Sequence, residues 1–152
     1  MAGIHHQLSI DAPAATVYEA IATPERIGTW WDRQVVTRTD RGLVLEHNPG
    51  SEHGVVRLLV VEQIPGRRIE WECISPHPAS SPASAWTGTR FIFELSEAGA
   101  GPARATTVNF RHAGYDERSP FYGFNNFAWG QVLKTLKETV ESDAQPSARK
   151  PS

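Results

Sequence analysis

The sequence predicts an α+β fold in which a curved antiparallel sheet wraps around a long C-terminal helix, with two short helices between strands 1 and 2. Apolar and polar residues alternate over residues 4–10, the period-two pattern of a strand with one buried face. About six further strand patterns follow over residues 34–111, and consecutive strands joined by short turns pair antiparallel. The chain then has one long segment of apolar residues at helical spacing, long enough to cover a concave sheet.

The two short helices are expected directly after the first strand. Pro13 stands where a helix begins, and an apolar stripe at helical spacing follows it over residues 14–21. Residues 23–25 restart a second helix, with threonine as its cap, proline in its first turn and glutamate at its positive end. The apolar side of this second helix is supplied by Ile27, Trp30 and Trp31.

Short strands and tight turns are expected in the middle of the chain. Residues 35–37 and 43–47 are predicted strands, and a longer one covers residues 55–63. Pro65-Gly66 fits the central positions of a type II turn, because proline fixes φ and glycine permits a positive φ. Residues 76–84 are rich in Pro, Ser and Ala and form a loop of unassigned role. The strand before this loop places Ile69, Trp71 and Cys73 on one face.

The last two strands and the final helix complete the fold. Residues 99–102 are predicted to connect the two strands. Ser119-Pro120 is predicted to begin a helix of about two dozen residues. Residues 1–142 are expected to form a single domain, and residues 143–152 a disordered tail. Lys134 and Lys137 face outward. The side chains expected on the inner face of the two strands are Thr87, Thr89, Phe91, Phe93 and Leu95, then Thr106, Val108, Phe110 and His112.

Composition restricts the partners and the compartment. Fifteen basic and 17 acidic residues give a formal charge of −2, which provides no field to hold a polyanion, so no nucleic-acid partner is expected. No apolar stretch approaches the ~20 residues that span a bilayer, and no signal peptide is visible. The single cysteine, Cys73, cannot form an internal disulfide, which favours a reducing, cytoplasmic location.

Four segments carry a family likeness that covers the chain from about His5 to Glu141: residues 10–21, 23–31, 65–71 and 129–137. With these segments the chain resembles the START-like (SRPBCC) helix-grip superfamily. It is most similar to the bacterial branch related to the heat-shock-protein ATPase activator homologue and to polyketide cyclase/dehydrase proteins. The resemblance implies a cavity between the curled sheet and the long helix that binds an apolar or aromatic small molecule. Function belongs to the site and not to the fold, so the ligand is not implied.

Most of the residues proposed to line this cavity are aromatic. Large rings also fill a dry core, so each ring fits either interpretation. Asn125 shares a helix face with Trp129 and is either a polar handle for a ligand or a contact to solvent or the preceding loop. The proposed ligand-binding residues are Trp30, Trp31, Trp71, Thr89, Phe91, Phe93, Phe110, His112, Phe121, Phe124, Asn125 and Trp129.

His112 is the candidate catalytic residue. An inward imidazole in an apolar pocket acts as an acid or base or orients a ligand carbonyl, and the alternative is a neutral histidine bonded to a backbone group. Metal binding is not expected, because His47, His53 and His77 lack the spacing of ligands that share a face, and no cofactor is expected. No serine lies in a GxSxG context, and Cys73 is expected to be buried and inert.

Three functions fit these features. The first is binding of a small hydrophobic or aromatic molecule. The second is an enzyme of the cyclase, dehydrase or hydrolase kind that uses His112, so whether the protein is an enzyme is left open. The third is a co-chaperone-like module that stimulates an ATPase and would need an exposed apolar patch or a free edge strand. Trp30-Trp31 at a helix end fits a homodimer interface as well as a pocket rim.

Overall fold

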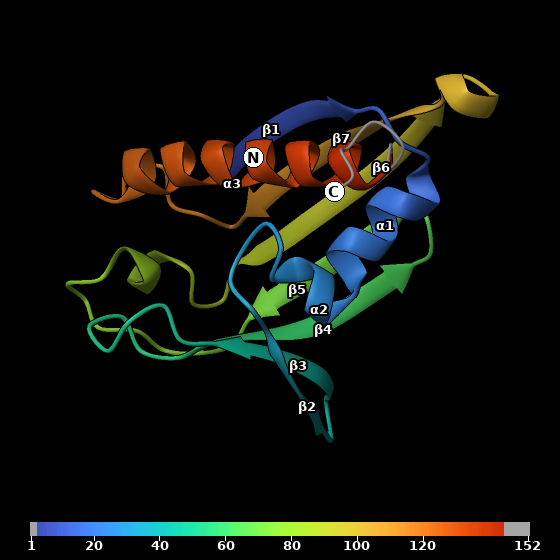
Figure 1. The fold of residues 1–152 in the computed structure, drawn as a ribbon. Helices are drawn as coiled ribbons and strands as arrows, with labels where there is room; N and C mark the ends of the chain where they lie inside the picture. The colour runs from blue at the N-terminus through green and yellow to red at the C-terminus, as the bar shows by residue number, and fades with distance from the viewer. Residues whose placement is uncertain (1–2, 145–152) are drawn as a thin grey trace, which may run out of the picture.

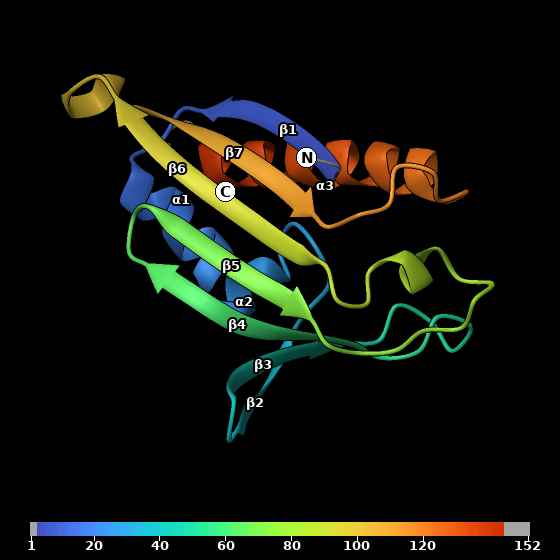
Figure 2. The ribbon, with the colours of Figure 1, turned by 180° about the vertical axis from the view of Figure 1, so that it is seen from behind.

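The computed structural model describes residues 3–144 and contains a seven-stranded antiparallel sheet in the order β1-β7-β6-β5-β4-β3-β2 (Figure 1). The helices lie on one side of this sheet, as the view from behind in Figure 2 shows. The helical elements are α1 (Ala14–Ala22), α2 (Pro24–Ile27), the 3-10 turns η1 (Pro82–Ala85) and η2 (Gly101–Ala103), and α3 (Tyr122–Ala144). The strands are β1 (Gly3–Ile10), β2 (Val35–Thr39), β3 (Gly42–His47), β4 (Val56–Ile64), β5 (Arg68–Cys73), β6 (Arg90–Ala98) and β7 (Ala105–Ala113).

The first and last strands pair along the whole length of β1, which makes β1 one edge of the sheet. Ile4 lies opposite His112, and Ile10 lies opposite Thr106. On β7 every second side chain is buried, which confirms the period-two prediction for this strand. The last strand, β7, therefore lies beside the first strand, and α3 follows it in the chain.

Local turn chemistry and one bulge shape the middle of the sheet. Ile64 accepts a backbone hydrogen bond from Arg67 at 2.9 Å, and Gly66 has φ +75°, which confirms the predicted turn at Pro65-Gly66. The pairing of β4 with β5 shifts register between Val60 and Glu62. A bulge of this kind bends its strand and increases the local twist, so it helps to curl the sheet.

Several predicted boundaries differ from the structure by one or more residues, and those of β6 and α3 matter most. β6 begins at Arg90, so Thr87 and Thr89 precede the strand; Thr87 Oγ1 instead donates to the Ser75 carbonyl at 2.7 Å. The helix α3 begins at Tyr122 and continues to Ala144, so it takes up the first residues of the segment predicted as a tail. The rest of that predicted tail lies outside the described residues.

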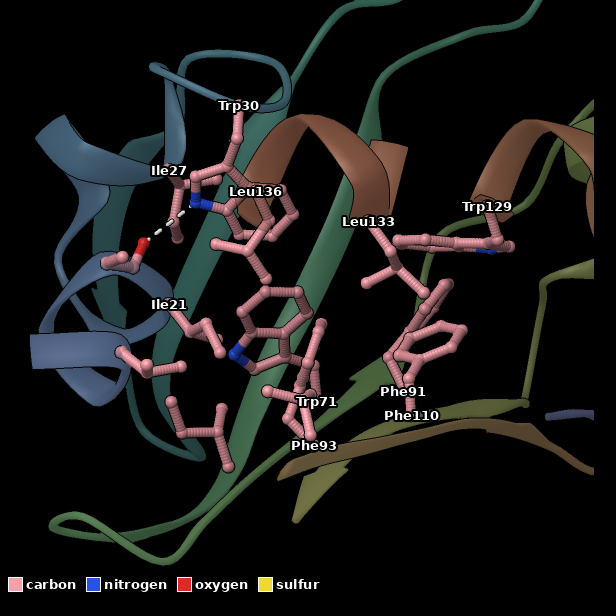
Figure 3. Close-up of a cluster of buried hydrophobic side chains, with 14 of the residues drawn as sticks. Ile21, Ile27, Trp30, Trp71, Phe91, Phe93, Phe110, Trp129, Leu133 and Leu136 are labelled. Carbon is pink, nitrogen blue, oxygen red and sulfur yellow. Dashed lines mark hydrogen bonds between the residues drawn. The ribbon is translucent and has the colours of Figure 1, made fainter. Parts of the chain in front are cut away.

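The core lies between the concave face of the sheet and the three helices. Trp71, Phe91, Phe93 and Phe110 are completely buried, and Trp129 of α3 is 3% exposed against them. Trp30 is anchored because its indole Nε1–H donates to the Ala20 carbonyl at 2.9 Å. Figure 3 shows the centre of this core, with Ile21, Ile27, Trp30, Trp71, Phe91, Phe93, Phe110, Trp129, Leu133 and Leu136 labelled.

The outer face of the sheet carries a network of ion pairs. Arg68 donates to Glu62 at 2.8 Å, to Glu70 at 2.7 Å and to Glu94. Glu70 also accepts from Arg90 at 2.6 Å and is only 7% exposed. Opposite charges on neighbouring strands stabilise a sheet modestly. This face is therefore a charged surface.

Candidate ligand-binding site

A pocket of about 220 Å³ opens at the end of the molecule where α3 begins. Its walls come from the segment after α2, the loop between β3 and β4, the η1 region and the first turns of α3. Aromatic side chains form most of the wall, and imidazole and amide groups provide its polar atoms. The rings and polar side chains that define it are Trp31, Trp86, Phe124, His47, His53 and Asn125.

Trp31 joins the pocket to the core. The backbone of α2 positions it, because Trp31 N–H donates to the carbonyl of Ile27, a completely buried residue, at 2.8 Å. All five tryptophans of the chain form one connected cluster, with Trp31 in contact with each of the others. From Trp31, the ring centroids lie at 6.2 Å for Trp30, 6.2 Å for Trp71, 6.3 Å for Trp86 and 5.2 Å for Trp129.

Trp86 forms the wall between the pocket and the core, and it was not predicted from the sequence. It directly follows η1, and its indole Nε1–H donates to Asn125 Oδ1 at 3.2 Å. Its ring lies 5.1 Å from Phe91 and 5.8 Å from His112 between centroids. No periodicity marks a residue in such a loop. The available signal was the presence of a large aromatic side chain beside a Pro-, Ser- and Ala-rich stretch.

Asn125 fixes the loops around the pocket to the first turns of α3. It is 3% exposed and accepts from Trp86 at Oδ1. Its Nδ2 donates to the carbonyls of Pro82 at 3.3 Å and Phe121 at 3.2 Å, and to the Tyr115 hydroxyl. Of the alternatives for this amide, the structure therefore shows the contact to the loop. Its hydrogen-bonding groups are already engaged within the protein.

His47 places an imidazole beside an acid at the pocket rim. Its Nδ1 lies 3.0 Å from Gln34 Oε1, and its Nε2 lies 3.5 Å from an Asp32 carboxylate oxygen. Its ring also packs edge-on against Trp31, with centroids 4.8 Å apart. Burial lowers the pKa of His47, and the Asp32 charge opposes part of that effect. Protonation of His47 would thus create an ion pair at the rim.

Two histidines connect the loops that form the outer wall. His53 Nδ1 lies 2.7 Å from Ser81 Oγ, and His77 Nδ1 lies 2.7 Å from the His53 carbonyl. His77 Nε2 lies 2.8 Å from Ser75 Oγ. Both serines are 2% exposed, so these contacts hold the loops of the outer wall in place. Within residues 3–144, no group of three or more His, Cys, Asp and Glu side chains could hold a metal ion.

His112 is completely buried and does not line this pocket. Thr89 Oγ1 lies 2.6 Å from His112 Nε2 and 2.5 Å from the Trp86 carbonyl, to which it donates its only proton. His112 Nε2 must therefore carry the hydrogen in this bond, which leaves Nδ1 as an acceptor. Burial lowers the pKa of His112 to about 3, so the imidazole is neutral at physiological pH.

The other predicted site residues fall into two groups. The rings of Trp71, Phe91, Phe93, Phe110 and Trp129 are buried in the core, where Figure 3 shows all five. Phe121 and Phe124 were expected to face inward, but Phe121 is half-buried and Phe124 is 61% exposed. Phe124 nevertheless reaches the pocket from its outer lip. The site is therefore nearer the molecular surface than the sequence predicted.

Comparisons with known proteins agree on the fold. A solution structure of the Aha1 dimer from Colwellia psychrerythraea is 25% identical, with a TM-score of 0.70 over 93% of this chain and 97% of that chain. Protein MLL2253 from Mesorhizobium loti is 16% identical, with a TM-score of 0.72 over 92% and 97%. CalU16 from Micromonospora echinospora is 15% identical, with a TM-score of 0.65 over 95% and 78%. Identities this low establish the helix-grip fold alone for the last two.

Family membership rests on a match over most of the chain. No curated protein matches the sequence significantly. No helix among the described residues is long and apolar enough to cross a membrane. The family model for Activator of Hsp90 ATPase homolog 1-like protein matches residues 11–141, which include both short helices, six of the strands and nearly all of α3. The chain therefore belongs to the Activator of Hsp90 ATPase homolog 1-like family.

Proposed function

We propose that the protein binds a small hydrophobic or aromatic molecule in the pocket between the sheet end and the N-terminal turns of α3. The observation that carries the proposal is the set of three rings, Trp31, Trp86 and Phe124, around a space of about 220 Å³. Apolar pockets with a few placed polar groups are the usual form of small-molecule sites.

The size of the pocket limits the ligand. A protein cavity of about 150 Å³ is known to hold benzene, so a space of about 220 Å³ suits a molecule of one to two fused rings. Flat ligands are favoured because Trp31 and Trp86 offer ring faces and edges for stacking. The His47–Asp32 pair at the rim supplies a polar contact for a substituent that stays near water.

Calorimetric titration with 2-naphthol tests this proposal. We expect saturable binding in the wild type and about fivefold weaker binding in Phe124→Ala, because truncation removes about 1 kcal/mol of apolar contact. Phe127→Ala is the matched control: Phe127 is 68% exposed on the same helix but does not line the pocket. Binding that weakens equally in both variants, or an absence of binding to one- and two-ring aromatic probes, would overturn the proposal.

The enzymatic alternative depends on whether a ligand reaches His112. Its neutral imidazole has an acceptor nitrogen, but a pKa of about 3 makes it a weak general base, and the ring of Trp86 lies between it and the pocket. Turnover that disappears in His112→Gln, while the affinity for 2-methoxynaphthalene is retained, would favour an enzyme. Binding without turnover favours a carrier or receptor.

The co-chaperone alternative is supported by the family to which the chain belongs and by the Aha1 relative. That relative is described as a dimer, so a homodimer is also proposed for this chain. Sedimentation of the purified protein distinguishes monomer from dimer. Stimulation of a purified Hsp90 ATPase would support an activator, whereas an unchanged ATPase rate together with aromatic binding would support the ligand-binding function.

A further inference from the structure

Three buried polar atoms lack a hydrogen-bond partner among the described residues: Trp71 Nε1, His112 Nδ1 and Trp129 Nε1. Such groups are uncommon because each loses its bonds to water on folding. In Figure 3 the nitrogen of Trp71 points toward Ile21, whereas that of Trp129 lies on the side of the ring away from Leu133. The two indole N–H groups therefore point into different parts of the core.

His112 and Trp129 have complementary hydrogen-bonding roles. The Thr89 hydroxyl fixes the proton of His112 on Nε2, so Nδ1 only accepts. The indole Nε1–H of Trp129 only donates. The two rings face each other edge-on, with centroids 6.4 Å apart. A single hydroxyl group accepts one hydrogen bond and donates another, and these are the two kinds of bond that the two atoms lack.

Trp86 separates these two atoms from the pocket. Its ring is 5.8 Å from the His112 ring and 6.2 Å from the Trp129 ring, and it also lines the pocket. Trp86 is half-buried in the segment between η1 and β6, and its indole is held by one hydrogen bond to Asn125. Trp86 therefore lies between the pocket and the two rings that carry the unpaired atoms, and a ligand group would reach them only after this side chain moves.

We propose that the pocket continues beneath Trp86 to a polar subsite, formed by His112 Nδ1 and Trp129 Nε1, that takes the hydroxyl of a phenolic ligand. This inference rests on the proposed function and specifies the class of ligand. A ketone or ether oxygen accepts from Trp129 but cannot donate to His112. A carboxylate also lacks a proton to donate to His112, and it would carry a charge into the core. The neutral state of the imidazole excludes a donor role for Nδ1.

The experiment compares 2-naphthol with 2-methoxynaphthalene, which keeps the ring system but lacks the donated proton. We expect 2-naphthol to bind the wild type roughly tenfold more tightly, because only the hydroxyl satisfies both buried atoms. His112→Phe keeps a flat ring but has no acceptor nitrogen, so the two compounds should bind it almost equally. Trp129→Phe should reduce the preference in the same way.

Trp71→Phe is the matched control. It also removes a buried unpaired indole N–H, but one that points toward Ile21, so the tenfold preference should persist. Nitrogen-15 NMR of the imidazole gives a second readout: 2-naphthol should shift the His112 Nδ1 resonance, and 2-methoxynaphthalene should not.

The outcomes separate the two proposals. Equal affinities for both compounds in the wild type, with Nδ1 unshifted, would overturn the phenolic subsite and leave the binding function standing. A preference that survives both His112→Phe and Trp129→Phe would overturn the subsite as well. Failure of both compounds to bind the wild type would overturn both proposals.

Discussion

The hydroxyl of Thr89 lies 2.6 Å from Nε2 of His112 and joins this imidazole to the backbone carbonyl of Trp86. The contact connects the core to the pocket wall. It fixes the imidazole in one neutral form and ties the segment that carries Trp86 to β7. The ionisation of His112 and the position of the Trp86 segment are therefore linked through one short chain of hydrogen bonds.

The ionisation of His112 predicts a specific loss of stability in mild acid. The folded pKa is about 3, whereas an unfolded histidine has a pKa near 6.5. Between these values only the unfolded state binds the proton, so stability falls as pH falls through 6.5. From pH 7 to pH 5 the wild type should lose about 2 kcal/mol more than His112→Gln, measured by urea unfolding at each pH. Parallel pH profiles would contradict this.

Replacement of the Thr89 hydroxyl should destabilise the fold. Thr89→Val keeps the shape but leaves the His112 Nε2–H and one lone pair of the Trp86 carbonyl without this partner. We expect a loss of about 1–3 kcal/mol in the free energy of unfolding. Thr37→Val on the exposed strand β2 is the matched control and should change it by less than about 0.5 kcal/mol. Equal effects of the two substitutions would contradict the role of Thr89.

The strands were predictable because their patterns are local. The alternation on β1 and β7 follows from the two-residue period of a strand with one buried face. The pocket was not predictable in the same way. Its outer wall combines the segment between β3 and β4 with the η1 region, and neither has a periodic pattern. Only tertiary contacts such as His53 with Ser81 bring the two together.

Helix geometry explains the difference for Phe124. Helical residues advance by about 100° each, so Phe124 lies about 140° from Trp129 around the helix axis. Trp129, Leu133 and Leu136 point at the core, and Phe124 therefore points toward solvent beside the pocket. The apolar residues of α3 are too widely spread around the axis to form one stripe. This angle follows from residue numbers alone, so the sequence could have placed Phe124 at the outer edge of the pocket and not in the core.

The outer face of the sheet should lose stability when Glu70 is neutralised. Burial alone would raise the pKa of Glu70, but the hydrogen bonds from Arg90 and Arg68 outweigh it and lower the pKa. The ionised Glu70 therefore stabilises the fold at neutral pH, and this stabilisation is lost as pH falls through the lowered pKa of Glu70. Glu70→Gln should cost about 1–2 kcal/mol at pH 7. Glu62→Gln, at a more exposed partner of Arg68, should cost less than half as much by urea unfolding; similar costs would contradict this.

Asn125 should control the position of Trp86, and its neighbour Asn126 supplies the comparison. Asn125 holds Trp86, Pro82 and Tyr115 from a buried position, whereas among the described residues the Asn126 side chain makes one hydrogen bond, to His6 at 2.8 Å. Asn125→Ala leaves several buried groups unpaired, so we expect a loss of about 2–3 kcal/mol and a red-shifted tryptophan emission as the Trp86 indole gains contact with water. Asn126→Ala should cost at most about 1 kcal/mol and leave the emission unchanged. Because the pocket wall depends on Trp86, Asn125→Ala should also weaken 2-naphthol binding. Unchanged emission and unchanged binding in Asn125→Ala would show that the rest of the η1 segment holds Trp86 without the amide.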